Sequence, residues 1–461
     1  MSRTRWYLVA ALAVVTVAVV TLDATGVIFQ PGVDAPQTTV VTMATPGPPE
    51  AALQPSVDEP LPAEEVARLQ RTVERALGAD ELGRRVSAYV ATSGGQSVLD
   101  ERSTRAGVPA STVKLFTALA ALDVLDPEFR IVTRVVAGPD ARSVVLVGGG
   151  DATLATSRPA RRDVQVASLE QLAGATGRSL QARGITRVRL LYDDSLFTGP
   201  AVAPTWGDTY VSSGVVAPVT ALMVDQGLVD PSSGSLARES DPARAAAGRF
   251  AALLADRGIA VRGEVTRAAA PGTAEVLAEV ASPVLSALVE RMLTDSDNQL
   301  AEALGRLAAL ASGRPASFTG AGATLLAQAQ LRDVETSGSR LFDASGLSRP
   351  NRLAPVGTAG VLTVAAADPT LRPLTVGLPV AGLTGTLADR YLTGRSARGA
   401  GLVRAKTGTL TGVAAEAGLV VACEGRLVVF SFVADRVPFD IEAARAALDR
   451  AATALASCPA A

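Results

Sequence analysis

The sequence contains no histidine in 461 residues and only two cysteines, Cys423 and Cys458. Without histidine, neither a Ser-His-Asp triad nor a Cys-His pair can form, and metal sites built on imidazole are excluded. Two cysteines are too few for a thiolate metal cluster. A nucleophilic serine in this chain therefore needs another base, and lysine is the recognised substitute for histidine. We expect no metal and no cofactor.

Lysine is almost as scarce. Of the 43 lysine and arginine residues, only Lys114 and Lys406 are lysines. Arginine stays charged under all ordinary conditions, whereas a lysine removed from water can lose its proton and act as a base. Every other basic residue of the chain is an arginine, so an ammonium side chain occurs at these two positions alone. Both lysines are therefore candidates for chemistry.

Aromatic residues make up only 4% of the chain and the net charge is −2. Because there is neither a basic stripe nor a platform of aromatic side chains, nucleic acid is not expected as a partner. The 48% of hydrophobic residues is enough for substantial cores, and the length permits about two to three domains. A Cys423–Cys458 bridge would form in an oxidising compartment, and two buried thiols are the alternative.

Residues 1–29 have the pattern of an export segment. Arg3 and Arg5 precede an apolar run from Trp6 to Leu22, which fits either an uncleaved membrane anchor or a removed signal. Basic residues before the run hold the N-terminus in the cytoplasm, so the rest of the chain is exported. Residues 30–62 are rich in proline and predict an extended linker. We expect an extracytoplasmic protein, attached to the membrane through its N-terminal segment or secreted.

The first of three motifs that suggest catalysis joins Ser111 to Lys114. A helix is predicted from Ser111 to about Leu125, and residues three apart on a helix share one face. Apart from Lys114 and Thr117, residues 113–122 are apolar all round, which is typical of a helix buried on every side. Burial lowers the pKa of a lysine from its ordinary value of about 10.4. The pattern therefore predicts Ser111 as a nucleophile and Lys114 as its base.

The second motif, Ser296-Asp297-Asn298, interrupts a helical pattern that runs over 283–311. Here Ser296 can relay a proton and Asn298 can hydrogen-bond a substrate amide. The spacing from Ser296 to Gln299 is also that of a helix capping box, which is compatible with both roles.

The third motif, Lys406-Thr407-Gly408, precedes two predicted strands at 413–422 and 427–435. An ammonium group and a hydroxyl on an edge strand suit an extended peptide that ends in a carboxylate. The glycine has no side chain, so it lets a substrate backbone come close.

These three motifs, in this order, resemble those of class C low-molecular-mass penicillin-binding proteins of the D-Ala-D-Ala carboxypeptidase/endopeptidase type. The stretches 146–151, 192–195, 296–302 and 343–352 are similar as well, and the similarity covers roughly residues 64–458. The insert between the first two motifs looks shorter than the family's fullest form, so a third domain is expected to be reduced or missing.

The resemblance implies an α+β, penicillin-recognising serine transpeptidase-like fold, in which an antiparallel sheet is flanked by helices and a smaller, mostly-β domain is inserted. The catalytic domain would comprise residues 63–133 and 272–461, and the inserted domain residues 134–271.

The resemblance also implies roles for the site residues. By position, Ser111 is the acyl-ester nucleophile, Lys114 its base and Ser296 the proton relay. The N–H of Thr409 completes an oxyanion hole with that of Ser111. Substrate is bound by Asn298, Lys406 and Thr407.

With these roles the chain would be an exported serine DD-peptidase that removes the terminal D-Ala from peptidoglycan stem peptides, with β-lactams as covalent inhibitors. Cleavage of cross-links stays open as a second activity. Two alternatives are a serine β-lactamase, which must hydrolyse its acyl-enzyme fast, and a non-catalytic peptidoglycan-binding protein that retains the cleft.

Overall fold

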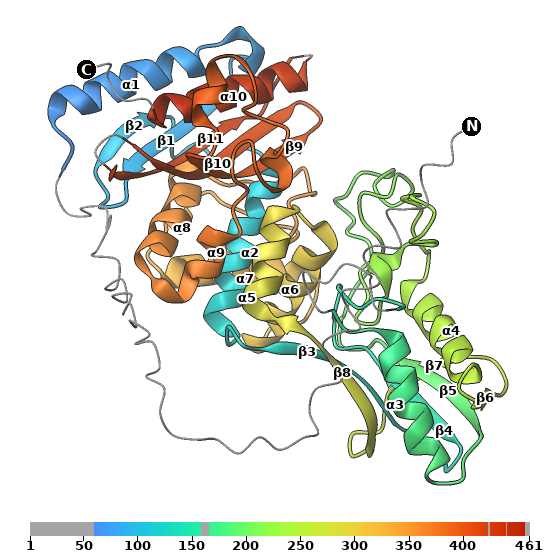
Figure 1. The fold of residues 1–461 in the computed structure, drawn as a ribbon. Coiled ribbons are helices and arrows are strands. Elements are labelled where there is room, and N and C mark those ends of the chain that lie inside the picture. Colours follow the sequence, from blue (N-terminus) through green and yellow to red (C-terminus); the bar gives the residue numbers. More distant parts are fainter. Residues whose placement is uncertain (1–59, 158–165, 423–424, 439, 457–461) are drawn as a thin grey trace, which may run out of the picture. The chain divides into compact units, whose positions relative to one another are not determined.

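A computed structural model describes residues 60–157, 166–422, 425–438 and 440–456. The predicted export segment, most of the proline-rich linker and both cysteines lie outside these ranges. None of the helices within them is both long enough and apolar enough to cross a membrane. The described chain contains two β-sheets, each covered by its own helices (Figure 1).

The first sheet is antiparallel throughout and has the strand order β2-β1-β11-β10-β9. Its strands are β1 (Val86–Thr92), β2 (Ser97–Glu101), β9 (Val403–Leu410), β10 (Val413–Val421) and β11 (Leu427–Ala434). One face is covered by α1 (Ala63–Leu77) and α10 (Ile441–Ala456), which pack on each other (Figure 1). Because β9 is the last strand in the order, the third motif lies on the edge of this sheet.

Helices cover the other face of the first sheet and surround α2 (Val113–Val124). They are α5 (Leu285–Thr294), α6 (Asn298–Ala311), α7 (Phe318–Leu331), α8 (Pro355–Ala367) and the short α9 (Arg372–Val376). Every residue of α2 from Val113 to Leu122 is buried, which confirms the prediction made from its apolar pattern. The positions of α5 and α6 agree with the helical pattern predicted over 283–311, and α7 agrees with a helix that the sequence predicts from about 321 to 330.

The second sheet has the order β6-β5-β4-β3-β8, with β7 beside β5. Its strands are β3 (Arg130–Ala137), β4 (Ser143–Val147), β5 (Arg187–Asp193), β6 (Ala260–Val261), β7 (Thr266–Arg267) and β8 (Val276–Val284). It is mixed, because β4, β6 and β7 run parallel to β5 while β4 and β8 run antiparallel to β3. The sheet begins with β3 at Arg130 and ends with β8 at Val284, so it extends beyond the predicted insert of residues 134–271 at both ends.

Two helices pack on this second sheet, α3 (Leu169–Gln181) and α4 (Pro242–Ala255). Of these, α4 agrees with a helix that the sequence predicts from about 241 to 258, while α3 has no counterpart among the sequence predictions. The continuous strand predicted over 261–266 is wrong in its middle. Gly263 has a φ of +74° there, and this left-handed backbone separates the two-residue strands β6 and β7.

Candidate active site

Ser111 and Lys114 lie together at the start of α2. Ser111 belongs to η2, a 3-10 turn over Ala110–Thr112, and Lys114 lies one turn further along. Lys114 Nζ is 3.1 Å from Ser111 Oγ. It also donates hydrogen bonds to Asn298 Oδ1 at 2.8 Å and to the carbonyl oxygen of Ser345 at 2.7 Å. The predicted nucleophile, the predicted base and one residue of the second motif therefore meet at a single amine.

The environment of Lys114 favours loss of its proton. The side chain is fully buried, and this burial lowers the pKa of Lys114 to about 8. The negative charges of Asp343, Glu302 and Asp297 oppose the shift without cancelling it. The neutral form, which is the state that a base requires, is therefore far more populated near neutral pH than for a lysine in water.

Lys406 is fully buried too, on β9. Burial and repulsion from the positive charges of Lys114 and Arg390 hold the pKa of Lys406 well below its usual range. Its Nζ donates to the carbonyl oxygen of Thr407 at 2.8 Å. The two lysine amines are therefore close enough to influence each other electrostatically.

Gly408 has a role in packing that the sequence does not indicate. A Cβ atom added to it would lie 2.7 Å from the carbonyl oxygen of Pro109 and 3.2 Å from the amide nitrogen of Ser111. The missing side chain therefore lets β9 approach the turn that carries the nucleophile, which is a different reason for glycine from the predicted contact with substrate.

The amide of Thr409 points toward the open edge of β9. Ala405 N donates to the carbonyl oxygen of Pro379, which lies on the side of β9 away from β10. Amides of alternate residues in a strand point the same way, so the N–H groups of Thr407 and Thr409 share this edge. Gly408 also approaches Ser111 N closely. The backbone N–H groups of Thr409 and Ser111 therefore lie in the same region, at the edge of β9.

The second motif connects α5 to α6. Ser296 has a φ of +56°, an uncommon conformation for a residue with a side chain. Asp297 caps α6, because its side chain accepts a hydrogen bond from Leu300 N at 3.0 Å. The capping box predicted from Ser296 to Gln299 is therefore wrong. Within the described chain the Ser296 hydroxyl makes no hydrogen bond to Ser111 or Lys114, and it lines a pocket of about 280 Å³ with Asn298.

Residues of the long connection between β5 and α4 hold the start of α6. Val215 O accepts a hydrogen bond from Asn298 Nδ2 at 3.1 Å, and Ala217 N donates to Gln299 Oε1 at 2.9 Å. Gln226 Nε2 donates to Asp297. Because Asn298 also accepts from Lys114, the connection between β5 and α4 is linked through one amide to the Lys114 amine.

A third segment, residues 343–351, completes the site and has no predicted role beyond its similarity to the family. Ser345 supplies the carbonyl oxygen that accepts from Lys114. Its own amide and that of Ala344 donate to Glu302 Oε1 at 2.8 and 3.1 Å. The side chain of Asp343 accepts from Gly346 N at 3.0 Å and from Trp206 Nε1 at 2.8 Å. Two buried carboxylates therefore fix the loop that contacts the base.

Glu302 forms a buried ion pair with Arg306, whose Nη1 lies 3.3 Å from Glu302 Oε2. Burial and the negative charge of Asp343 raise the pKa of Glu302 to about 7, while Arg306 opposes this shift. The Arg306 guanidinium also lies 4.0 Å from the ring centroid of Phe318, a cation–π contact. The sequence does contain a signal for this ion pair, because Glu302 and Arg306 are four residues apart among the apolar residues that follow Gln299 in α6.

Gly346 packs directly on the nucleophile's turn. Its φ is +89°, and an added Cβ atom would lie 3.0 Å from Ser111 N and closer still to the backbone of Ala110. Ala110 itself has a φ of +47°. The residue directly before Ser111 thus has an uncommon backbone conformation, and Gly346 packs against it.

Comparison with known proteins identifies similar chains. A family model described as the D-Ala-D-Ala carboxypeptidase 3 (S13) family matches residues 69–239 and 232–455. A carboxypeptidase of Mycobacterium tuberculosis is 38% identical over 356 residues, which are 76% of this chain and 75% of the relative. Carboxypeptidase DacB of Mycolicibacterium smegmatis is 34% identical over 422 residues, 90% of each chain.

Solved structures support the same fold. Penicillin-binding protein 4 of Haemophilus influenzae superposes with a TM-score of 0.69 and 23% identity. The match covers 83% of this chain and 97% of that structure. At this identity the likeness concerns the fold, an α+β arrangement of a sheet flanked by helices.

Proposed function

The chain belongs to the D-Ala-D-Ala carboxypeptidase 3 (S13) family, and from that premise we propose that Ser111, Lys114 and Ser296 are its catalytic residues. The protein is a serine-type DD-peptidase that binds penicillin and acts on peptidoglycan outside the cytoplasm. The observation that carries the assignment of residues is the buried amine of Lys114, 3.1 Å from the hydroxyl of Ser111.

In the proposed reaction, neutral Lys114 takes the proton of Ser111 as Oγ attacks the carbonyl carbon of the penultimate D-Ala. The N–H groups of Ser111 and Thr409 hold the resulting oxyanion, and such a donor contributes about 3 kcal/mol. The C–N bond then breaks, the leaving amine of D-Ala takes a proton through Ser296 or from Lys114, and Ser111 keeps the acyl group. Water hydrolyses the ester, which releases the shortened stem and restores the hydroxyl.

The substrate-binding roles follow from groups that remain available. Asn298 uses its oxygen for Lys114 and one amide hydrogen for Val215, which leaves a second amide hydrogen for a substrate carbonyl. Lys406 and Thr407 lie on the edge strand and provide an ammonium group and a hydroxyl for the terminal carboxylate, and the Thr407 hydroxyl also hydrogen-bonds with that of Thr386 at 2.9 Å. A carboxylate beside Lys406 would favour its protonated form.

β-Lactams fit the same steps. Attack by Ser111 opens the ring, and because the former amide nitrogen stays attached to the acyl group, no free amine departs. We expect labelled penicillin to be captured by the wild type and not by Ser111→Ala. Undiminished labelling of Ser111→Ala would contradict the assignment of the nucleophile.

We propose carboxypeptidase activity as the main activity of the protein, and cleavage of peptidoglycan cross-links as a second candidate activity. The full-length protein should be incubated with defined monomeric and cross-linked muropeptides, and the products weighed by mass spectrometry. Loss of one D-Ala from the monomer supports carboxypeptidase action, whereas separation of the cross-linked dimer supports endopeptidase action. Prompt release of penicilloate would instead favour a β-lactamase, and muropeptide binding without any product would favour a non-catalytic protein.

We also propose that residues 1–29 stay on the mature protein as a membrane anchor. The support is the apolar run that follows Arg3 and Arg5. Recovery of the protein in the membrane fraction, with an intact N-terminus by mass spectrometry, is the expected result. A mature N-terminus beyond residue 22 would show that the segment is a removed signal.

A further inference from the structure

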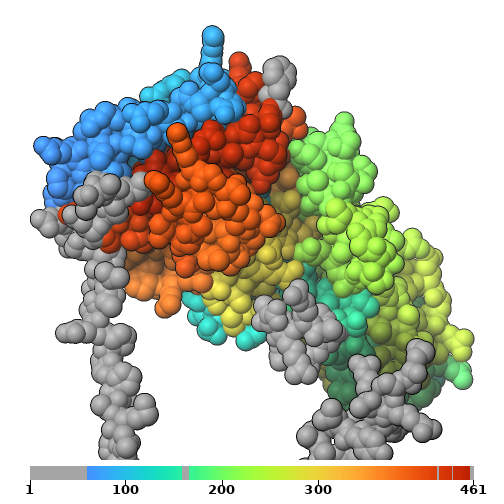
Figure 2. All heavy atoms as spheres, turned by 45° about the horizontal axis from the view of Figure 1, so that its top comes forward, coloured from blue at the N-terminus to red at the C-terminus, as the bar shows by residue number. Residues whose placement is uncertain are grey.

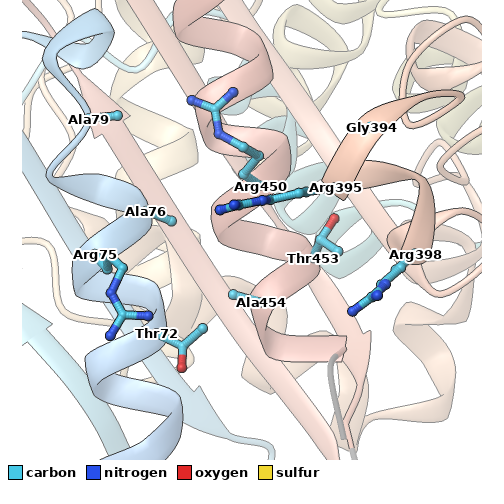
Figure 3. Close-up of a pocket in the computed structure, with 10 residues that line it drawn as sticks. All are labelled: Thr72, Arg75, Ala76, Ala79, Gly394, Arg395, Arg398, Arg450, Thr453 and Ala454. Carbon is cyan, nitrogen blue, oxygen red and sulfur yellow. The ribbon is translucent and has the colours of Figure 1, made fainter.

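A hollow lined by arginine lies between α1, α10 and η6, a 3-10 segment over Gly394–Gly399 (Figure 3). Its volume is about 540 Å³. We call it the arginine hollow, and it is lined by Thr72, Arg75, Ala76, Ala79, Gly394, Arg395, Arg398, Arg450, Thr453 and Ala454. It shares no residue with the site around Ser111.

The hollow is formed by close packing of regular elements. Its floor carries alanines and threonines, whose small side chains leave the space unfilled. A Cβ atom added to Gly399 would lie 2.5 Å from Thr453 Oγ1 and 3.0 Å from the ring of Tyr391, so η6 is pressed against α10. Thr453 Oγ1 also donates to the carbonyl oxygen of Ser396 at 3.2 Å. Figure 2 shows α1 (blue) and α10 (red) side by side at the surface, with the orange segment beside them.

The charge of the hollow is of one sign. None of its lining residues is acidic, and within the described chain Arg75, Arg395 and Arg398 form no ion pair. Arg450 makes one exposed contact of 3.5 Å with Glu81. Some arginines elsewhere in the described chain are instead neutralised by carboxylates.

Two buried or half-buried arginines illustrate the contrast. Arg390 contacts both Glu416 and Asp449, and Arg332 contacts both Asp123 and Asp368. Four guanidinium groups around one hollow repel one another, and an anion would relieve that repulsion.

We propose that the arginine hollow binds a diphosphate, meaning a compact anion with two adjacent phosphate groups. Guanidinium groups match phosphate oxygens with paired hydrogen bonds, and arginine is the preferred residue for such recognition. A concave space of this size is in the range of small-molecule sites, which span about 300–1,000 Å³. The arginines project into the hollow from three elements, α1, α10 and η6. A single phosphate group is too small to contact all four of them, whereas two adjacent phosphate groups offer more oxygen acceptors.

The test is a calorimetric titration of the full-length protein with inorganic pyrophosphate. The informative variant is Arg395→Gln/Arg398→Gln, which removes two positive charges from the hollow. The matched control is Arg142→Gln/Arg187→Gln, which removes two exposed, unpaired arginines from the second sheet and its loop. Penicillin capture by both variants checks that they are folded, since neither pair belongs to the proposed catalytic machinery.

We expect saturable binding by the wild type, a dissociation constant at least tenfold higher for the hollow variant, and less than a twofold change for the control. Absence of saturable binding by the wild type would overturn the proposal. Equal weakening in both variants would overturn it as well, because the effect would then come from net charge alone.

A competition experiment distinguishes a diphosphate from a lipid headgroup. Glycerophosphoglycerol, the headgroup of an anionic phospholipid without its acyl chains, carries a single phosphodiester. If it fails to displace pyrophosphate at tenfold excess, the diphosphate assignment is supported. If it displaces pyrophosphate at equal concentration, the diphosphate assignment is wrong and a lipid headgroup takes its place.

Discussion

Lys114 Nζ and Ser111 Oγ lie 3.1 Å apart at the start of a helix that is buried on all sides. The spacing of three residues makes the contact possible, and the burial of α2 makes it chemically useful. In water, the lysine would remain protonated at neutral pH and could not accept a proton. The buried helix therefore provides the condition under which a lysine replaces the histidine that this chain lacks.

Replacing the base tests this relationship. Lys114→Arg keeps a positive charge but removes the ability to give up a proton near neutral pH. We expect acylation by labelled penicillin to be slowed by about 10²–10⁴-fold, the usual contribution of a general base. Rapid quenching followed by gel fluorescence measures the rate, and thermal melting reports whether the larger side chain is accommodated. Acylation at the wild-type rate would contradict the role of Lys114.

The pH dependence of acylation follows from the lowered pKa of Lys114, about 8. The base acts in its neutral form, which is scarce below this pKa and dominant above it. The acylation rate should therefore rise about tenfold per pH unit up to about pH 7, and level off above pH 8 to 9. Stopped-flow measurement with a chromogenic β-lactam gives the profile. A rate that falls between pH 6 and 8 would be inconsistent with this base.

Removal of Glu302 should damage both stability and chemistry. Glu302→Ala leaves Arg306 buried without its partner and frees the amides of Ala344 and Ser345, so we expect a loss of about 3–5 kcal/mol in the free energy of unfolding. The double variant Glu302→Ala/Arg306→Met should be less destabilised than the single one, because no unpaired charge remains. Urea unfolding monitored by fluorescence compares them.

The same two variants show whether Glu302 only stabilises the fold or also positions the Ser345 carbonyl oxygen against Lys114. In the double variant the amide of Ser345 still lacks its acceptor, so the carbonyl that contacts Lys114 is held less firmly. Acylation should therefore stay slow even where stability is recovered. If acylation recovers together with stability, Glu302 has only a structural role.

Gly408 should not tolerate even the smallest side chain. The methyl group of Gly408→Ala would lie 2.7 Å from a carbonyl oxygen of the nucleophile's turn, so β9 or that turn must shift. We expect penicillin capture to fall at least 100-fold, since a displacement of about 1 Å in an active site has an effect of that size. Gly248→Ala, in open space on α4, is the control and should leave capture unchanged. Normal capture by Gly408→Ala would show that the contact is relaxed without cost.

Composition and local sequence pattern were enough to predict several strands and two residues of the candidate site. Two lysines in a chain without histidine singled out Lys114 and Lys406, and the apolar run around Lys114 predicted its burial. The strands β10 and β11 agree with the segments predicted at 413–422 and 427–435, and β1 agrees with a strand that the sequence predicts over 86–92. Each is a run of β-branched and apolar residues between turns. These features depend on short stretches of sequence, which is why sequence alone sufficed.

Other features depend on contacts between distant segments, which a single sequence does not reveal. Helix α3 begins with a capping box at Ser168 and Gln171, but Gly174 and Gly177 weaken its helical pattern. Asp297 rather than Ser296 caps α6, although both residue types are good caps. The choice between them reflects where the insert packs, since Gln226 binds the same carboxylate.

Val215 accepts a hydrogen bond from the start of α6, and Ala217 and Gln226 donate hydrogen bonds to it, so all three help to position Asn298. A shift of these residues would move Asn298 and, through it, the amine of Lys114 that we propose as the base. Divergence between related enzymes can therefore accumulate in the inserted segment and alter turnover while every catalytic side chain stays the same.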